Sequence, residues 1–201
     1  VDYGSEIIFN NYVPKDIIPQ QLETKLSSTD GETHIVYAGT ISSQTEGHHY
    51  DLRGIFKEIA DHQFHIHIYA SREDETYERL AQESKYINYH GHLDQRVLMK
   101  EMTRYDYGWA GFNDVKNKVH LDVCLPNKAF EYISCGLPVL SYPHKSLTEF
   151  IEGNNVGYIL NSIEELEESE SVRENVLKNR YTFTVENDGY LELMHATLVV
   201  D

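Results

Sequence analysis

The stretch Leu125-Pro-Asn-Lys-Ala-Phe-Glu-Tyr-Ile-Ser-Cys-Gly-Leu-Pro-Val-Leu-Ser141 combines the features of a short helix, a tight turn and a buried strand. Pro126 suits the first helical position, because its fixed φ fits a helix and its missing N–H would be unpaired there anyway. Gly136 stands where a helix end favours a positive φ. The apolar run at residues 137–140 predicts a strand. We therefore expect a helix, a turn and a strand, with one helix face packed on a core.

Polar residues at the start of this helix indicate a binding site. Asn127 and Lys128 lie in the first turn, where free backbone N–H groups and the helix dipole attract anions. A cation in a first turn is mildly unfavourable by itself, so Lys128 favours an anionic partner over simple solvation. Glu131 follows one turn later on the same side, and a carboxylate there suits two vicinal hydroxyls, as on a ribose. The alternative is that Glu131 is an ordinary helix residue in a salt bridge.

The stretch from Pro126 to Val139 resembles the donor-site signature of group 1 (family 4-like) glycosyltransferases of the GT-B fold. In that signature Pro-x-Lys-x-x-Glu-Tyr is followed by Gly-x-Pro-Val. The resemblance implies a C-terminal donor-binding domain in which Glu131 holds the ribose of a nucleotide sugar. It also implies that the start of the helix holds the diphosphate, through Pro126, Asn127, Lys128 and Ala129.

Composition is typical of one sizeable globular domain covering residues 1–201. The chain has 201 residues, of which 40% are hydrophobic, and a formal net charge of −16. This charge argues against nonspecific binding to nucleic acid or to an anionic membrane surface. Cys124 and Cys135 form neither a disulfide framework nor a zinc site, so we expect buried thiols and a reducing, cytoplasmic location. No apolar run approaches the ~18 residues of a membrane span.

Predicted strands and helices alternate along the chain. Strands are predicted at residues 6–9, 34–38, 64–69, 86–89, 106–110, 137–140 and 156–160, and helices at 52–59, 73–83, 94–102, 126–135, 146–151, 172–180 and 184–199. Residues 27–32 and 112–122 read as polar turn and loop, and the acidic segment 164–170 as a solvated face. This order predicts an α/β fold with a doubly wound parallel sheet, Rossmann-like, as in one half of a GT-B glycosyltransferase.

Ligands of such sheets bind beyond the carboxyl ends of the strands. The loops at Gly39-Thr40 and Gly91-His92-Leu93 and the helix start at Pro126 all lie at such ends, so we expect them to line one crevice. The resemblance implies that the backbone at His92 and Leu93 contacts the base; the alternative is an ordinary strand-to-helix turn.

Two positions depart from the family pattern. The family places a phosphate-binding Arg directly after the glycine at Gly39 and a Lys a few residues later, whereas this chain has Thr40 and no nearby Lys. The family also has an acidic residue eight positions before the signature Glu, where this chain has Val123. Asp122, which is adjacent, is therefore the only catalytic candidate, and a weak one.

The eleven histidines show no set with metal-ligand spacing and carboxylates, so we expect separate polar histidines and no metal. The resemblance agrees, because GT-B enzymes generally need no metal for the diphosphate. No cofactor is expected beyond the nucleotide-sugar substrate.

The function predicted is transfer of a hexose from a nucleotide diphospho-sugar, UDP-linked, to a polysaccharide, lipid-linked or other glycan acceptor. We expect the N-terminal acceptor domain to be absent from this chain, because the chain resembles only the C-terminal half of the family and begins with Val1 in place of Met, as an excised domain would. Peripheral association with the inner membrane face would depend on the missing domain. Two alternatives stay open: a sugar-nucleotide epimerase of the same fold, and a degenerate binding or scaffold domain, which Val123 and Thr40 favour.

Overall fold

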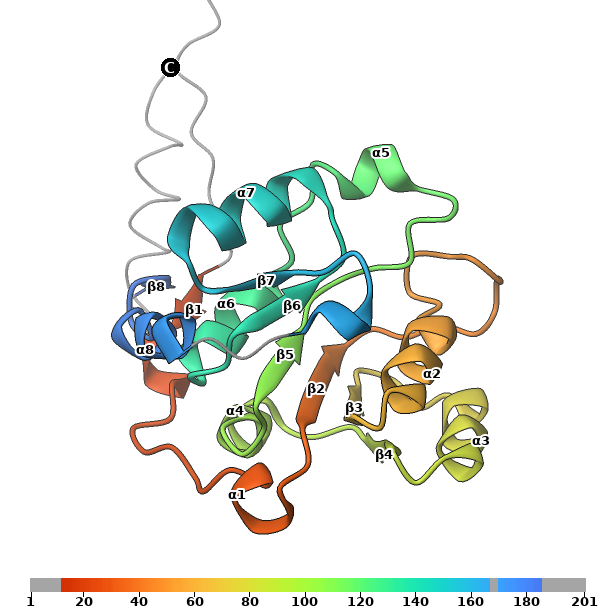
Figure 1. The fold of residues 1–201 in the computed structure, drawn as a ribbon, viewed down its shortest axis with the longest axis horizontal. Coiled ribbons are helices and arrows are strands. Elements are labelled where there is room, and N and C mark those ends of the chain that lie inside the picture. Colours follow the sequence, from red (N-terminus) through yellow and green to blue (C-terminus); the bar gives the residue numbers. More distant parts are fainter. Residues whose placement is uncertain (1–11, 167–169, 186–201) are drawn as a thin grey trace, which may run out of the picture.

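The structure is a computed structural model that describes residues 12–166 and 170–185. Its centre is a six-stranded parallel sheet in the order β4-β3-β2-β5-β6-β7 (Figure 1). The strands are β2 His34–Gly39, β3 His65–Ala70, β4 Ile87–Gly91, β5 Tyr107–Trp109, β6 Val139–Ser141 and β7 Gly157–Ile159. The chain moves outward from β2 to β4, returns to the other edge of β2 at β5, and moves outward again to β7. The predicted doubly wound parallel sheet is confirmed, with its switch point between β2 and β5.

Helices cover both faces of this sheet (Figure 1). On one face lie α2 Arg53–Asp61, α3 Glu75–Glu83 and the 3-10 turn η2 Ile163–Glu165; on the other lie α4 Gln95–Met102, α6 Asn127–Ser134, α7 Lys145–Asn154 and α8 Glu170–Lys178. The alternation of β2 side chains explains the two layers: Ile35 and Tyr37 join the α2 side, and Val36 and Ala38 the α6 side. One buried core lies on each face of the sheet, and together they hold the carboxyl ends of the strands in place.

Smaller elements complete the described chain. They are η1 Lys15–Ile17, α1 Ser27–Asp30, α5 Lys118–Leu121, and a two-stranded parallel pair of β1 Val13–Pro14 with β8 Thr184–Val185.

The signature segment folds as predicted, with one correction. Pro126 is the residue before α6 and has an extended backbone (φ −73°, ψ 136°), so the helix begins at Asn127 rather than at the proline. Gly136 has the expected positive φ of 77° just after the helix. Strand β6 then enters the sheet between β5 and β7.

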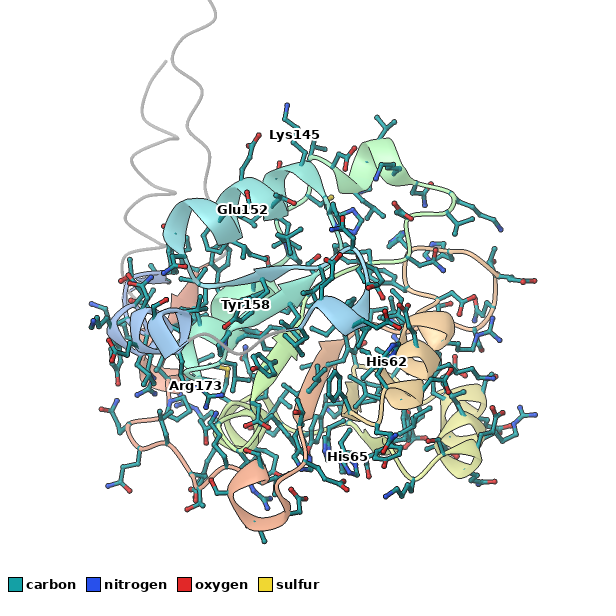
Figure 2. All side chains as sticks on the ribbon, viewed as in Figure 1. His62, His65, Lys145, Glu152, Tyr158 and Arg173 are labelled. Atoms are coloured by element: carbon teal, nitrogen blue, oxygen red, sulfur yellow. The ribbon has the colours of Figure 1, made fainter. Side chains whose placement is uncertain are left out.

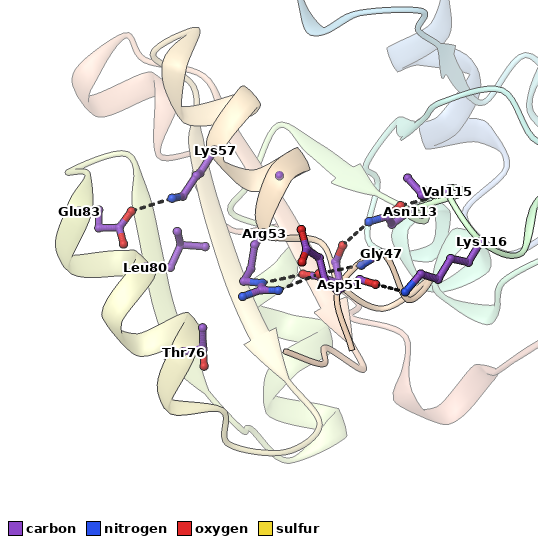
Figure 3. Close-up of a pocket in the computed structure, with 12 residues that line it drawn as sticks. Gly47, Asp51, Arg53, Lys57, Thr76, Leu80, Glu83, Asn113, Val115 and Lys116 are labelled. Atoms are coloured by element: carbon purple, nitrogen blue, oxygen red, sulfur yellow. Dashed lines mark hydrogen bonds and ion pairs between the residues drawn. The ribbon is translucent and has the colours of Figure 1, made fainter. Parts of the chain in front are cut away.

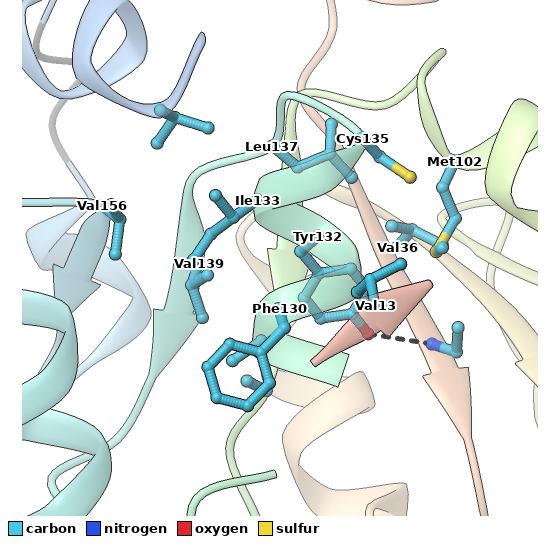
Figure 4. Close-up of a cluster of buried hydrophobic side chains, with 14 of the residues drawn as sticks. Val13, Val36, Met102, Phe130, Tyr132, Ile133, Cys135, Leu137, Val139 and Val156 are labelled. Atoms are coloured by element: carbon cyan, nitrogen blue, oxygen red, sulfur yellow. Dashed lines mark hydrogen bonds between the residues drawn. The ribbon is translucent and has the colours of Figure 1, made fainter. Parts of the chain in front are cut away.

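Tyr132 of α6 joins the two strands that diverge at the switch point (Figure 4). Its hydroxyl accepts a hydrogen bond from Ala38 N–H (3.0 Å) and donates one to the Trp109 carbonyl (3.1 Å). The ring lies directly on Gly108, where an added Cβ would be 2.2 Å from Tyr132 Cγ. The glycine is thus required by the close approach of α6 to the sheet.

Some sequence expectations were wrong. Residues 27–32 and 112–122, predicted as a turn and a loop, contain α1 and α5. The predicted helix at 184–199 does not begin at Thr184, because Thr184 and Val185 pair with β1 instead; these β-branched residues fit a strand. The rest of that helix, the strand at 6–9 and part of the acidic segment lie outside the described residues.

The two cysteines also differ from each other. Cys135 is buried, as expected, whereas Cys124 is partly exposed because α5 ends beside it at the surface.

Candidate functional site

A pocket of about 190 Å³ opens at the carboxyl ends of β2, β3 and β4, between α4 and α6. Its lining residues come from β2, β3, α4, α6 and the turns that follow β3 and β4: Ala38, Gly39, Tyr69, Ala70, Ser71, His92, Leu93, Gln95, Leu98 and Glu131. The pocket brings together Gly39, His92, Leu93 and Glu131, although Gly39 and Glu131 are 92 residues apart in the sequence (131 − 39). Two of the three stretches expected to line one crevice, at Gly39 and at His92-Leu93, therefore meet at the expected end of the sheet, whereas the helix start at Pro126 does not line the pocket.

Glu131 supplies the carboxylate of the pocket from the second turn of α6. Burial raises the pKa of its carboxyl group, while a hydrogen bond from the Gln95 side chain and the nearby Lys128 act in the opposite direction. Gln95 is the first residue of α4, whose start is capped by Asp94 through the Arg96 N–H (3.0 Å). The capped helix thus holds Gln95 against Glu131 and orients the carboxylate.

Lys128 is buried, with only 9% of its surface exposed. Its ammonium donates a hydrogen bond to Tyr37 Oη (3.1 Å) and lies 4.1 Å from the centre of the Tyr37 ring and 5.1 Å from that of Phe112. Within residues 12–166 and 170–185, no carboxylate pairs with it. Burial lowers the pKa of Lys128 to about 7, and Glu131 only partly offsets this.

Gly39 lies between the lysine and the pocket. Its φ of 152° is a conformation that other residues rarely adopt, and an added Cβ would be 3.5 Å from Lys128 Nζ. The end of β2, the ammonium of Lys128 and the pocket are therefore neighbours. An anion bound beside Gly39 would meet a buried positive charge.

The other predicted residues lie outside the pocket lining. Thr40 is exposed and its hydroxyl is 3.3 Å from Ser71 Oγ, while Asn127 is exposed at the start of α6. Pro126 is half-buried and Ala129 fully buried, so Ala129 serves the core. Gly91 ends β4 with a φ of 70°, which turns the chain toward His92.

Asp122 lies outside the pocket lining, directly after α5, and contacts the first residues of α7. Its carboxylate accepts a hydrogen bond from the Lys145 N–H (3.3 Å) and its carbonyl one from the Ser146 N–H (2.9 Å). Neighbouring Val123 is 72% exposed. In this structure Asp122 therefore anchors a loop.

Sequence reasoning missed Tyr69, Ser71 and Gln95 as pocket residues. Tyr69 and Ser71 mark the end of β3, and the alternating pattern at residues 64–69 predicted that strand. A signal was therefore available, because β3 pairs with both β2 and β4. Gln95 had no signal beyond its place next to the Asp94 cap.

A larger hollow of about 850 Å³ lies between α2, α3 and two loops (Figure 3). Four of its charged side chains form ion pairs, Arg53 with Asp51 at 2.7 Å and Lys57 with Glu83 at 2.9 Å, and Lys116 donates to the Glu46 backbone carbonyl. None of the signature residues lines it. The smaller pocket is therefore the candidate site, since the Lys128 ammonium, which has no carboxylate partner in the described chain, lies next to its lining residue Gly39.

The sheet and the pocket together define a class of protein: the Rossmann-like half of a GT-B glycosyltransferase. A family model described as glucosyltransferase 3-like, C-terminal domain, matches residues 35–187. The chain belongs to this family. Comparison with curated proteins gives no match.

Solved structures show the same fold at low sequence identity. WaaG, a glycosyltransferase involved in lipopolysaccharide biosynthesis, is 14% identical with a TM-score of 0.55 over 87% of this chain and 50% of its own. Sucrose-phosphate synthase from Thermosynechococcus elongatus is 12% identical with a TM-score of 0.57 over 93% of this chain and 48% of its own.

A third structure is itself a single domain. The C-terminal domain of a glycosyl transferase group 1 family protein from Francisella tularensis is 13% identical with a TM-score of 0.53, and the match covers 85% of this chain and 95% of that one. The present chain thus spans about half the length of the two enzymes above. Every helix in the described part of the chain is too short or too polar to cross a bilayer.

Proposed function

We propose that the pocket binds a nucleotide diphospho-sugar and that this chain is the donor-binding domain of a glycosyltransferase. The observation that carries the proposal is the pair formed by Lys128 and Glu131 in successive turns of α6. One is a buried ammonium without a carboxylate partner in the described chain, and the other is a carboxylate facing a pocket. A nucleotide diphosphate has groups that suit both, because it carries a dianionic diphosphate next to a ribose with vicinal hydroxyls.

Each part of the ligand has a place in this proposal. The ribose hydroxyls donate to Glu131, which Gln95 orients. The base lies against the turn at His92 and Leu93, and the diphosphate reaches past Gly39 toward Lys128. During transfer, negative charge develops on the leaving diphosphate, and a fixed positive charge in a water-poor site stabilises it there.

The donor and acceptor classes are part of the proposal. We infer a UDP-linked hexose as donor and a glycan or lipid-linked acceptor, as in polysaccharide biosynthesis. The acceptor would bind to a second domain, since the chain covers about half of full-length structures with this fold. The residues on this chain then bind the donor and stabilise the leaving group, and this domain alone is expected to bind but to turn over slowly.

The test is calorimetric titration of UDP, GDP and ADP into the domain and into Glu131→Ala. The expected result is selective binding of one nucleotide, weakened about 10- to 100-fold by the substitution, because hydrogen bonds to a charged acceptor are worth about 1.5–3 kcal/mol. Glu152→Ala is the matched control, since Glu152 is an exposed helix residue on α7, away from the pocket (Figure 2). Absence of binding to all three nucleotides would contradict a working donor site in this chain.

A further inference from the structure

Three histidines of the sheet gather on the face that packs against α4. His34 begins β2, and its register partner on β3 is His65; His67 follows two residues later on the same face. One ring nitrogen from each lies within 4.8 Å of the others. His34 Nδ1 and His67 Nε2 are 2.9 Å apart, and only 4% of His34 and 7% of His67 are exposed. The expectation of separate histidines is therefore wrong for these three.

The remaining nitrogens of these rings have polar partners. His34 Nε2 contacts the Asp30 carboxylate (3.0 Å), and His65 Nε2 contacts the Glu32 carboxylate. His65 Nδ1 lies 3.3 Å from Asn88 Nδ2, a contact that an ion bound to this nitrogen would replace. His67 Nδ1 is 3.0 Å from His90 Nε2. This arrangement is the usual environment of metal-binding histidines, in which the second nitrogen is held by a carboxylate or another polar group that fixes the ring and its tautomer.

We propose that His34, His65 and His67 form a binding site for a divalent transition-metal ion, with Zn²⁺ as the best-suited ion. Neutral imidazole nitrogens suit Zn²⁺, Cu²⁺ and Ni²⁺, whereas Mg²⁺ and Ca²⁺ prefer oxygen ligands. The three rings leave a fourth position for water. Nothing in the donor-site proposal depends on this ion, because the signature residues lie on α6 and not on this cluster.

Binding requires small movements of the rings. In a tetrahedral site with Zn–N bonds of about 2.0–2.1 Å, ligand nitrogens are about 3.4 Å apart, so His34 and His67 must separate slightly. The rings of His34 and His65 are stacked with centres 4.7 Å apart and planes 11° apart, so at least one of them must turn toward the ion. The three histidines lie on β2 and β3, so their side chains can rotate without a change of fold.

The proton balance of binding can also be followed through the cluster. Asp30 accepts the Nε2–H of His34, which leaves Nδ1 free and makes His67 the donor of the 2.9 Å bond. The ion takes the place of that proton, which moves to His67 Nδ1 and faces His90. His90 is exposed and exchanges its own proton with solvent.

The ion would connect the sheet to α1. Asp30 is the last residue of α1 and Glu32 follows it, so the carboxylates come from the connection into β2 while the imidazoles come from β2 and β3. Figure 2 labels His65 on the side of the molecule where α1 lies. Metal binding should therefore raise thermal stability, since an ion that binds only the folded chain stabilises it by mass action.

The experiment is titration of Zn²⁺ into the full chain, followed by calorimetry and thermal denaturation. We expect one equivalent to bind and to raise Tm, with Mg²⁺ giving no effect. His65→Asn should lower the affinity at least 10-fold; 15% of its side chain is exposed, so it is the ligand whose replacement least disturbs the fold. Glu32→Gln, at a 39% exposed side chain, should lower affinity about 10- to 100-fold through its effect on His65.

Co²⁺ provides a readout on the unmutated chain, because imidazole coordination gives visible absorption bands that Zn²⁺ should abolish by competition. The control is His120→Ala. His120 lies outside the cluster, and its Nε2 is 3.6 Å from Cys124 Sγ, so these two side chains are another potential pair of metal ligands. The affinity of this variant should equal that of the unmutated chain. Failure to bind Zn²⁺, or one-equivalent binding that survives His65→Asn, or its loss in His120→Ala, would overturn the proposal.

Discussion

Lys128 holds its positive charge in an unusual place, beside two aromatic rings and without an ion pair to a carboxylate of the described chain. A charge in such a place is costly, which is why burial brings its pKa to about 7. A bound diphosphate would remove the cost by supplying the opposite charge. This side chain therefore links the structure of the domain to the chemistry of the proposed ligand.

Diphosphate binding near pH 7 is expected to take up protons. Because Lys128 is only about half protonated there, an anion beside it raises its pKa and draws a proton from solvent. Calorimetry of UDP binding in buffers of different ionisation enthalpy measures this uptake. In Lys128→Met the uptake should vanish and UDP affinity should fall at least 10-fold.

A matched control for this change is Lys145→Met, since Lys145 is the first residue of another helix, α7, but is exposed. It should bind UDP like the unmutated domain. Unchanged proton uptake in Lys128→Met would show that another group titrates on binding.

His144 predicts a pH dependence of folding. It is 1% exposed, and neither ring nitrogen makes a hydrogen bond of good geometry within residues 12–166 and 170–185. Burial lowers its pKa despite the opposing effects of the Asp114 and Asp122 carboxylates and of the Phe112 backbone. Below its usual pKa of about 6.5 the unfolded chain gains a proton that the folded chain does not, so stability falls as pH falls.

His144→Leu should remove this contribution. The free energy of unfolding of the variant, minus that of the unmutated chain, should rise as the pH is lowered from 7 to 5. The rise should be at most about 1.4 kcal/mol per pH unit. Urea denaturation at several pH values measures the difference, and the other histidines cancel because both chains contain them. A difference that does not vary with pH would contradict a neutral, buried His144.

At the scale of elements, the contact of α6 with the switch point decides where the pocket lies. Tyr132 bridges Ala38 and Trp109, so α6 is fixed to the end of β2 that also carries Gly39. Gly108 allows the ring to reach that position. Packing in this region thus controls the distance between Glu131 and the strand ends.

Gly108→Ala should destabilise the domain by about 3 kcal/mol, because the new methyl group overlaps the Tyr132 ring and a packed core tolerates added atoms poorly. It should also weaken nucleotide binding by shifting α6. Gly54→Ala on α2 is the control: an added Cβ meets nothing within 4 Å, and alanine favours the helix. Equal stability of the two variants, measured by urea denaturation, would show that α6 is not held as tightly as described.

For the whole molecule, the features that could be predicted from the sequence are those that depend on neighbouring residues in the chain. The strands at 34–38, 64–69 and 86–89 and the helices between them follow from apolar periodicity, and the glycine turns at Gly39, Gly91 and Gly136 from local backbone chemistry. Parallel order then placed the Gly39 loop, the Gly91 loop and the helix start at Pro126 at one edge. The structure brings Gly39, His92 and Leu93 into one pocket, which the helix enters through Glu131 and not through its first turn.

What the sequence did not predict depends on contacts between distant segments. His34 and His65 are register partners, yet nothing in their spacing shows it, because register is set by the whole sheet. The burial of Lys128 depends on Tyr37 and Phe112, which lie on other elements. The pairing of β1 with β8 joins residues 171 positions apart (184 − 13) and overrode a helical pattern.

The donor site as a whole is tested by comparing UDP with 2′-deoxy-UDP on the unmutated domain and on Glu131→Ala. If Glu131 holds the ribose, the unmutated domain should bind UDP about 10-fold more tightly than the deoxy compound, since one hydrogen bond to a carboxylate is worth about 1.5 kcal/mol or more. Glu131→Ala should then bind the two compounds equally. A preference for UDP that persists in Glu131→Ala would show that the carboxylate in this pocket does not contact the ribose.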